Sequence, residues 1–222
     1  LGTIEKYIEG GISLNGLNDE EYTFLHHAVS GGNLGAVTFL LEHGANPNIC
    51  DERGNTPLHE ACQREFVDIA VILVRFGALL TEINSSGQTA FHIGASLGTL
   101  DLFSRIIDLP RSVLPELDLC TLDSHGCNLM HTAALNGHTS LLIFFVSLDV
   151  FDINQRDTCG KTALHYACGQ NSSDTVLFLI KHSVSMDITD DKGYTPLMYA
   201  IATGNYNISK WLVQQGASLF TK

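Results

Sequence analysis

The chain lacks a hydrophobic run long enough to cross a membrane. Its most apolar stretch, Leu141–Leu148, is far shorter than the roughly 20 residues that a transmembrane helix needs. No basic segment followed by an apolar one opens the chain, so we find no sign of a secretory leader. We therefore expect a water-soluble segment with no direct membrane insertion.

Basic residues are also scarce. The chain has 12 Lys plus Arg against 24 Asp plus Glu, which gives a formal net charge of −12. Such a surface repels the phosphates of nucleic acids and anionic lipids. We expect a protein or peptide partner with a basic or neutral surface, and no nucleic-acid partner.

Signatures of catalysis and of metal binding are missing. The sequence has no nucleophile elbow, Walker loop, H-E-x-x-H or kinase signature. Cys168 lies near His165, but both also fit as packing residues on one helix, so we expect no catalytic activity and no cofactor. The cysteines form no CxxC pair, and reduced thiols indicate a cytoplasmic or nuclear setting. They are Cys50, Cys62, Cys120, Cys127, Cys159 and Cys168.

What the chain has in abundance is repetition. A Thr-x-Leu/Phe-His signature begins at residues 23, 56, 89, 128, 162 and 195, so successive copies lie 33, 33, 39, 34 and 33 residues apart. Asn128 replaces the threonine in the fourth copy, and Met198 replaces the histidine in the sixth. A glycine precedes five copies by two residues. The pattern resembles the ankyrin-repeat family, whose period is 33 residues and whose core is T-P-L-H-x-A.

Each position of the repeat also has a physical reason. Thr56 can cap the N-terminus of a helix, and Pro57 fits the first helical position, where no N–H is needed. A second apolar helix follows over Val67–Val74, and Gly77 ends it in a left-handed conformation. One helix pair cannot bury both apolar faces by itself, so neighbouring pairs must stack. We predict an all-α solenoid of helix-turn-helix units joined by β-hairpin loops.

We predict one ankyrin-repeat domain over residues 1–222. A half-repeat at 1–17, with a helix over Leu1–Glu9, indicates a segment of a longer protein. The third repeat carries six extra residues between Ile107 and Asp123, including Pro110 and Pro115, so it is expected to form a loop, either a partner contact or a passive insertion. The full repeats fall at about 18–50, 51–83, 84–122, 123–156, 157–189 and 190–222.

Two sets of polar residues recur in phase. The Asp or Asn that opens each hairpin suits a turn, while an acidic ladder for a basic ligand is the alternative. The histidines of the signature are implied by the family resemblance to tie adjacent hairpins by hydrogen bonds. A metal site would need them to converge on one point, whereas stacked repeats set them in a row. These histidines are His26, His59, His92, His131 and His165.

The resemblance places partner binding in a concave groove formed by the hairpin tips and the first helices. Tyr22 and Tyr194 stand out as aromatic anchors, with packing on neighbouring hairpins as the alternative. Asp19 and Glu20 lie at the first tip. The predicted partner-binding residues are Tyr22, Glu52, Arg53, Asn55, Arg64, Gln88, His125, Lys161, Lys192 and Tyr194.

Two functions follow from the resemblance. The first is a non-catalytic recruitment module of a larger regulatory or trafficking protein, present as a monomeric array. The second is an IκB-like inhibitor of a transcription factor, since six repeats, an insertion after the third and an acidic charge are similar to that subfamily. The stretches Arg53–His59 and Asp152–Asn154 add to this similarity, although the extra N-terminal half-repeat does not. An enzyme is the third hypothesis and lacks any motif.

Overall fold

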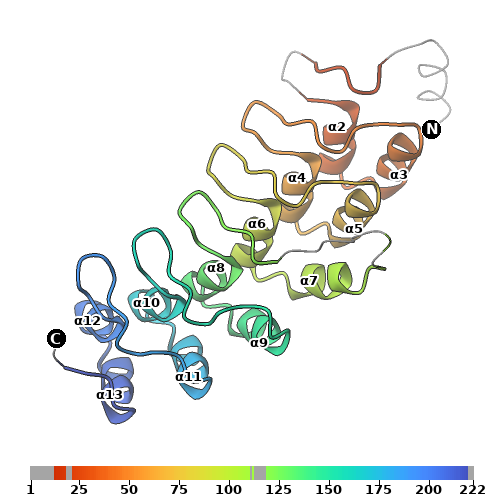
Figure 1. Ribbon diagram of the computed structural model, residues 1–222. Coiled ribbons are helices and arrows are strands. Elements are labelled where there is room, and N and C mark those ends of the chain that lie inside the picture. Colours follow the sequence, from red (N-terminus) through yellow and green to blue (C-terminus); the bar gives the residue numbers. More distant parts are fainter. Residues whose placement is uncertain (1–12, 19–21, 111, 113–118, 220–222) are drawn as a thin grey trace. The chain divides into compact units, whose positions relative to one another are not determined.

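The computed structural model describes residues 13–18, 22–110, 112 and 119–219 (Figure 1). The predicted helix over Leu1–Glu9, residues Asp19 and Glu20 and most of the insertion lie outside these ranges. The described chain divides into two compact units. The first runs to Gly94 and resumes from Asp101 into the insertion, and the second comprises Ala95–Leu100 and the described residues from Leu119 onward.

Helices follow one another in pairs along the described residues, with one pair in each predicted full repeat (Figure 1). The predicted all-α repeat solenoid is confirmed. A single antiparallel bridge between Ile83 and Thr89 is the described β-type pairing in the hairpin loops. The first helices of the pairs are α2 (Phe24–Ser30), α4 (Pro57–Gln63), α6 (Ala90–Leu97), α8 (Leu129–Leu135), α10 (Ala163–Gly169) and α12 (Pro196–Ala202). The second helices are α3 (Leu34–Glu42), α5 (Val67–Arg75), α7 (Leu100–Ile107), α9 (Thr139–Ser147), α11 (Ser173–Lys181) and α13 (Tyr206–Gln214).

In the first unit, helices of the same kind lie side by side. α2 packs against α3 and α4, and α5 packs against α3 and α4. Leu25 and Leu58 are fully buried at the same position of successive first helices, and Leu40 and Leu73 are fully buried at the same position of the second helices. The core therefore continues from one helix pair to the next, as a solenoid requires.

The second unit repeats this arrangement. α10 packs between α8 and α12, while α11 packs between α9 and α13. Met130, Leu164 and Leu197 are buried at one position of the three first helices, and Leu179 and Leu212 are buried at one position of two second helices. The same apolar positions thus build the core of both units.

Four first helices, α2, α4, α8 and α10, begin at a capping box in which a histidine side chain takes the role that Glu or Gln usually has. In α2, the Thr23 hydroxyl accepts a hydrogen bond from the His26 backbone N–H at 3.3 Å. The His26 ring accepts one in return from the Thr23 backbone N–H through Nδ1 at 3.2 Å. Asn128 and His131 make the same reciprocal pair at the start of α8. The Thr-x-x-His spacing therefore starts the helix as well as marking the repeat.

The turn between the two helices of a pair needs a left-handed residue. Gly32 has φ +65°, and a Cβ atom there would lie 3.1 Å from the Phe66 ring of the next repeat. Glu65 and Asn171 have φ 56° and 61° in the corresponding turns of the second and fifth repeats, a conformation that is uncommon without glycine. Close approach at Gly32 and backbone shape at all these turns fix how tightly neighbouring pairs stack.

Candidate partner-binding surface

A buried aspartate closes the hairpin of the second repeat. Asp51 is buried, with only 8% of its surface exposed. It accepts hydrogen bonds from the Arg53 N–H at 2.9 Å and the Asn55 N–H at 2.7 Å. In the sixth repeat, Asp190 accepts from the Lys192 and Tyr194 N–H groups in the same way. These aspartates act as turn residues rather than as an open acidic ladder.

Four histidine rings on first helices contact the hairpin of the next repeat. Nδ1 accepts a hydrogen bond from the backbone N–H of the capping residue, so the ring donates through Nε2. The His165 Nε2 donates to the Tyr194 carbonyl oxygen at 3.1 Å. The tie between hairpins implied by the family resemblance is therefore present. It also joins His26 to Asn55, His59 to Gln88 and His131 to Lys161.

The surroundings of these rings favour their neutral form. Burial is the largest influence and lowers the pKa of each ring, while the carbonyl that each one contacts raises it less. Among the residues that the structure describes, no three His, Cys, Asp or Glu side chains gather into a group that could hold a metal ion. The rings in question are those of His26, His59, His131 and His165.

In the first unit, most of the predicted contact residues have partners within the unit. Arg64 forms an ion pair with Glu60 on the same helix. Asn55 is half-buried, and its side-chain oxygen accepts a hydrogen bond from Asn84 at 3.0 Å. Gln88 is also half-buried. The two residues of the second tip, Glu52 and Arg53, are exposed.

Tyr22 packs on its own repeat. Its ring lies 5.4 Å from the His26 ring and 5.6 Å from the His27 ring, and the residue is half-buried. Burial, together with the carboxylates of Asp51 and Glu60, raises the pKa of Tyr22. The surroundings of this tyrosine are thus partly closed and acidic, and they suit an aromatic anchor less well than those of Tyr194.

In the second unit, three predicted contact residues are exposed. Tyr194 is 49% exposed at the sixth tip, and Lys192 beside it is also exposed. His125 is exposed at the fourth tip, where its carbonyl oxygen accepts a hydrogen bond from the Thr158 N–H at 3.0 Å. These three are predicted contact residues whose side chains are exposed in this unit, although the His125 ring lies 3.3 Å from the Ser124 hydroxyl.

Lys161 is held differently from the other predicted residues. It is half-buried, and its ammonium lies 5.5 Å from the centre of the Tyr166 ring and 5.2 Å from that of Tyr199. Tyr166 belongs to the same repeat as Lys161 and Tyr199 to the next one. The lysine therefore lies between two tyrosines from adjacent first helices.

Sequence reasoning missed those two tyrosines. The Tyr166 hydroxyl donates to Asp157 Oδ2 at 2.6 Å, and the Tyr199 hydroxyl donates to Asp190 Oδ2 at 2.8 Å. The signal was available, since each tyrosine directly follows the histidine position of its signature and the two stand at the same point of successive repeats. Both hydroxyls face the hairpin turn of their own repeat.

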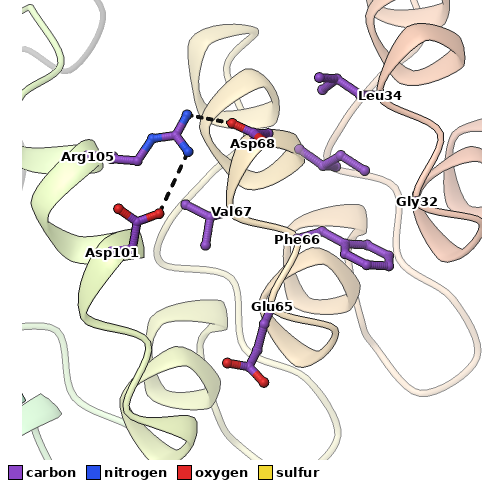
Figure 2. A pocket seen from close by; sticks show the side chains of 9 residues that line it. Gly32, Leu34, Glu65, Phe66, Val67, Asp68, Asp101 and Arg105 are labelled. Atoms are coloured by element: carbon purple, nitrogen blue, oxygen red, sulfur yellow. Dashed lines mark ion pairs between the residues drawn. The ribbon is translucent and has the colours of Figure 1, made fainter.

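A separate hollow of about 340 Å³ lies among the second helices of the first unit (Figure 2). Arg105 on α7 forms an ion pair there with Asp68 on α5 at 2.8 Å, and Asp101 lies 3.8 Å from the same guanidinium. The Asp68 hydrogen bond is the main cause that raises the pKa of Arg105. Arg105 thus joins two second helices, and we read this hollow as a packing feature of the stack.

The comparisons with known proteins agree with the geometry. A family model described as ankyrin repeats matches residues 2–79, 25–112 and 130–222. The chain belongs to the ankyrin-repeat family. No helix in the described part of the chain has both the length and the apolar character needed to cross a membrane.

Individual relatives come from different kinds of protein. The chain is 31% identical over 217 residues to the palmitoyltransferase AKR1 of Candida glabrata, covering 94% of this chain and 28% of that relative. It thus spans less than a third of the length of that relative. The solved ankyrin repeat domain of Bcl-3, an IkappaB protein family member, has a TM-score of 0.78 and 26% identity, covering 90% of this chain and 89% of that one. The ankyrin repeat protein EF0377 has a TM-score of 0.74 and 26% identity, with 86% and 96% covered.

Proposed function

We propose that this chain is the recruitment module of a larger regulatory or trafficking protein. Ankyrin repeats form protein-interaction scaffolds, and the partner is expected to contact the hairpin tips and the neighbouring surface of the first helices. The net charge of −12 supports attraction of a partner with a basic or neutral surface during approach. We further propose a cytoplasmic or nuclear location and a non-catalytic role for the segment itself.

One observation carries this proposal. The residues that define the repeat, such as Asp190 and His165, are buried and are bonded within the stack. The residues between them at the tips, such as Arg53, Lys192 and Tyr194, are exposed and vary from repeat to repeat. A surface whose frame is constant and whose exposed side chains vary is suited to selective recognition.

The relatives support a module that serves another domain. The matched part of the Candida glabrata palmitoyltransferase is 28% of its length, so any activity of that protein beyond the repeats lies outside the likeness. We propose by analogy that the repeats of this chain bring a partner to an activity carried elsewhere in its parent protein.

An IκB-like inhibitor is the second candidate. It is favoured by the likeness to the repeat domain of Bcl-3, an IkappaB protein family member, which extends over 90% of this chain. In that case the partner would be a transcription factor, and the parent protein would need no catalytic domain.

Affinity purification from cells tests the recruitment proposal. A variant with Arg53→Ala and Tyr194→Ala removes one exposed tip residue from each unit. The matched control carries Arg75→Ala and Tyr206→Ala, which remove the same residue types from exposed positions on second helices. We expect the tip variant to lose its main partners and the control to retain them.

Circular dichroism of both proteins shows whether either variant has lost its fold. A folded tip variant that recovers the unchanged partner set, or a control that loses it equally, would rule out the tips and first helices as the binding surface. Identification of the recovered partner as a transcription factor, rather than a cytoplasmic client, would favour the inhibitor.

A further inference from the structure

Two hollows adjoin on the second unit, and the Tyr199 side chain lines both. One, of about 290 Å³, also includes Leu135, Lys161 and Tyr166. The other, of about 330 Å³, also includes Lys192 and Tyr194 and has a mainly apolar lining. Each hollow therefore combines tyrosine walls with one lysine.

The first lysine has no carboxylate partner. No ion pair joins the Lys161 ammonium to an acidic side chain within the described part of the chain. The ammonium instead lies over the rings of Tyr166 and Tyr199. A lysine or arginine of a partner would have to displace the Lys161 ammonium from those rings, and the two positive charges would repel each other. The arrangement therefore disfavours a cationic side chain from a partner.

The nearby aspartates are already engaged. Asp157 accepts hydrogen bonds from the Cys159 and Lys161 N–H groups through Oδ1 and from the Tyr166 hydroxyl through Oδ2. Asp190 is 4% exposed and has the equivalent three donors. Because these carboxylates already accept hydrogen bonds within their own repeats, they are poorly placed to bind a cationic side chain of a partner.

We infer that this surface binds an extended peptide segment in which carboxylate side chains flank an apolar or aromatic one. This inference rests on the proposed recruitment function and specifies the chemistry of the partner. The carboxylates pair with Lys161 and Lys192, and the apolar side chain packs against Tyr199 between them. An ammonium and a carboxylate attract each other more strongly at a half-buried site than in open solvent.

The repeat geometry sets the expected spacing of the two carboxylates. Lys161 and Lys192 belong to the hairpin tips of adjacent repeats, and packed helices lie about 8–10 Å apart. An extended chain advances about 3.3 Å per residue. The two acidic residues of the segment are therefore expected to be about three positions apart.

The overall charge restricts this segment further. With a net charge of −12, the chain repels a long acidic run as it approaches. A segment with one or two carboxylates beside apolar side chains can still pair with Lys161 and Lys192, and the net negative charge of the chain repels it only weakly. The partner as a whole can still have the basic or neutral surface proposed above.

A positional-scanning library of fluorescein-labelled nonapeptides tests the inference on the full 222-residue chain. Retained peptides are expected to be enriched in Asp or Glu at two positions about three apart, with Leu, Phe or Tyr between them. Enrichment of Lys or Arg, no acidic preference, or no retained peptide would overturn it.

Lysine variants then locate the contact by fluorescence anisotropy with the best retained peptide. We expect Lys161→Gln to weaken binding about tenfold, as loss of a charge-assisted contact implies, and Lys161→Arg to restore most of it. Lys210→Gln is the matched control, because it makes the same charge change on an exposed part of α13. Equal weakening by the Lys161 and Lys210 substitutions would contradict a local contact, and thermal melting checks that each variant is folded.

The two proposals can fail separately. If the peptide library overturns the acidic segment while affinity purification still depends on Arg53 and Tyr194, the recruitment function stands with a partner of different chemistry. If neither the library nor the purification depends on the hairpin tips, both proposals are wrong.

Discussion

The two units share one frame and differ in the side chains that they leave free. In the first unit, Asn84 donates to Asn55 near the tips, and Arg64 pairs with Glu60 at the far end of α4. In the second, Arg156 pairs with Asp191 at the tips, but the Lys161 ammonium lies over two tyrosine rings. The repeat signature therefore determines the stack but not the chemistry of each exposed surface.

Substitutions in the buried core test the shared frame and should cost the most stability. Leu58 and Leu164 occupy the same position in the two units, and both have no exposed surface. Leu58→Ala and Leu164→Ala should each lower the free energy of unfolding by about 2–5 kcal/mol, because each leaves a cavity in a packed core. Urea unfolding followed by circular dichroism measures both, and Trp211 fluorescence reports on the second unit, which contains the single tryptophan. A cost below about 1 kcal/mol in either unit would contradict a common core.

The next effect is specific to the second unit. Tyr166→Phe removes the hydroxyl donor to Asp157 Oδ2 and leaves that oxygen with only the weak Cys127 thiol donor at 3.9 Å. It should cost about 1–3 kcal/mol, because a largely buried carboxylate oxygen loses its strong hydrogen bond. Tyr194→Phe makes the same change at a residue that is 49% exposed, and it should cost less than about 0.5 kcal/mol. Urea unfolding followed by Trp211 fluorescence compares them. Equal costs would mean that the tyrosine and aspartate pair has no stabilising role.

A pH series tests whether both units depend on neutral histidines. Burial lowers the pKa of His26, His59, His131 and His165 in the folded chain. The unfolded chain therefore binds protons first as the pH falls below the ordinary histidine pKa of about 6.5. The contribution of the neutral rings to the free energy of unfolding is therefore complete above that pH. It is lost as the pH falls through the lowered pKa values of the folded chain, by at most about 1.4 kcal/mol per ring per pH unit.

Urea midpoints measured from pH 8 to pH 5 test whether the chain loses stability as the solution is acidified. We expect a constant midpoint at the upper end and a steady fall below about pH 6.5. A midpoint that rises as the solution is acidified would contradict neutral, buried rings in the folded state.

The smallest effect concerns the surface pair of the first unit. Arg64→Gln breaks an ion pair between exposed or partly exposed side chains four residues apart on one helix. Such pairs contribute about 0.5 kcal/mol or less, so the urea midpoint should hardly move. A loss above about 1 kcal/mol would show that the pair is part of the frame rather than of the free surface.

Sequence reasoning recovered the frame because its residues have local physical reasons. Thr56 and Pro57 start a helix, and Gly77 follows the second helix in a left-handed conformation with φ 87°, so their spacing is visible in the chain. The histidine ties followed from the family resemblance and are present in the structure.

The surface was recovered less completely because its chemistry depends on contacts between repeats. Lys161 was singled out as a tip residue, but its place over Tyr199 of the next repeat needs three-dimensional positions. Tyr166 and Tyr199 were not singled out, because their hydrogen bonds to Asp157 and Asp190 are not visible in the spacing of the signature. Arg64, in contrast, was expected to be free and forms an ion pair with its neighbour Glu60.

Photocrosslinking in cells shows which surface of the chain contacts the partner. A benzoylphenylalanine placed at Tyr194, 49% exposed at a hairpin tip, is compared with one at Tyr206, 74% exposed on α13. If the tips and first helices bind the partner, the probe at residue 194 captures it and the more exposed probe at residue 206 does not. Capture of the same partner at residue 206 alone, or equally at both, would contradict the account.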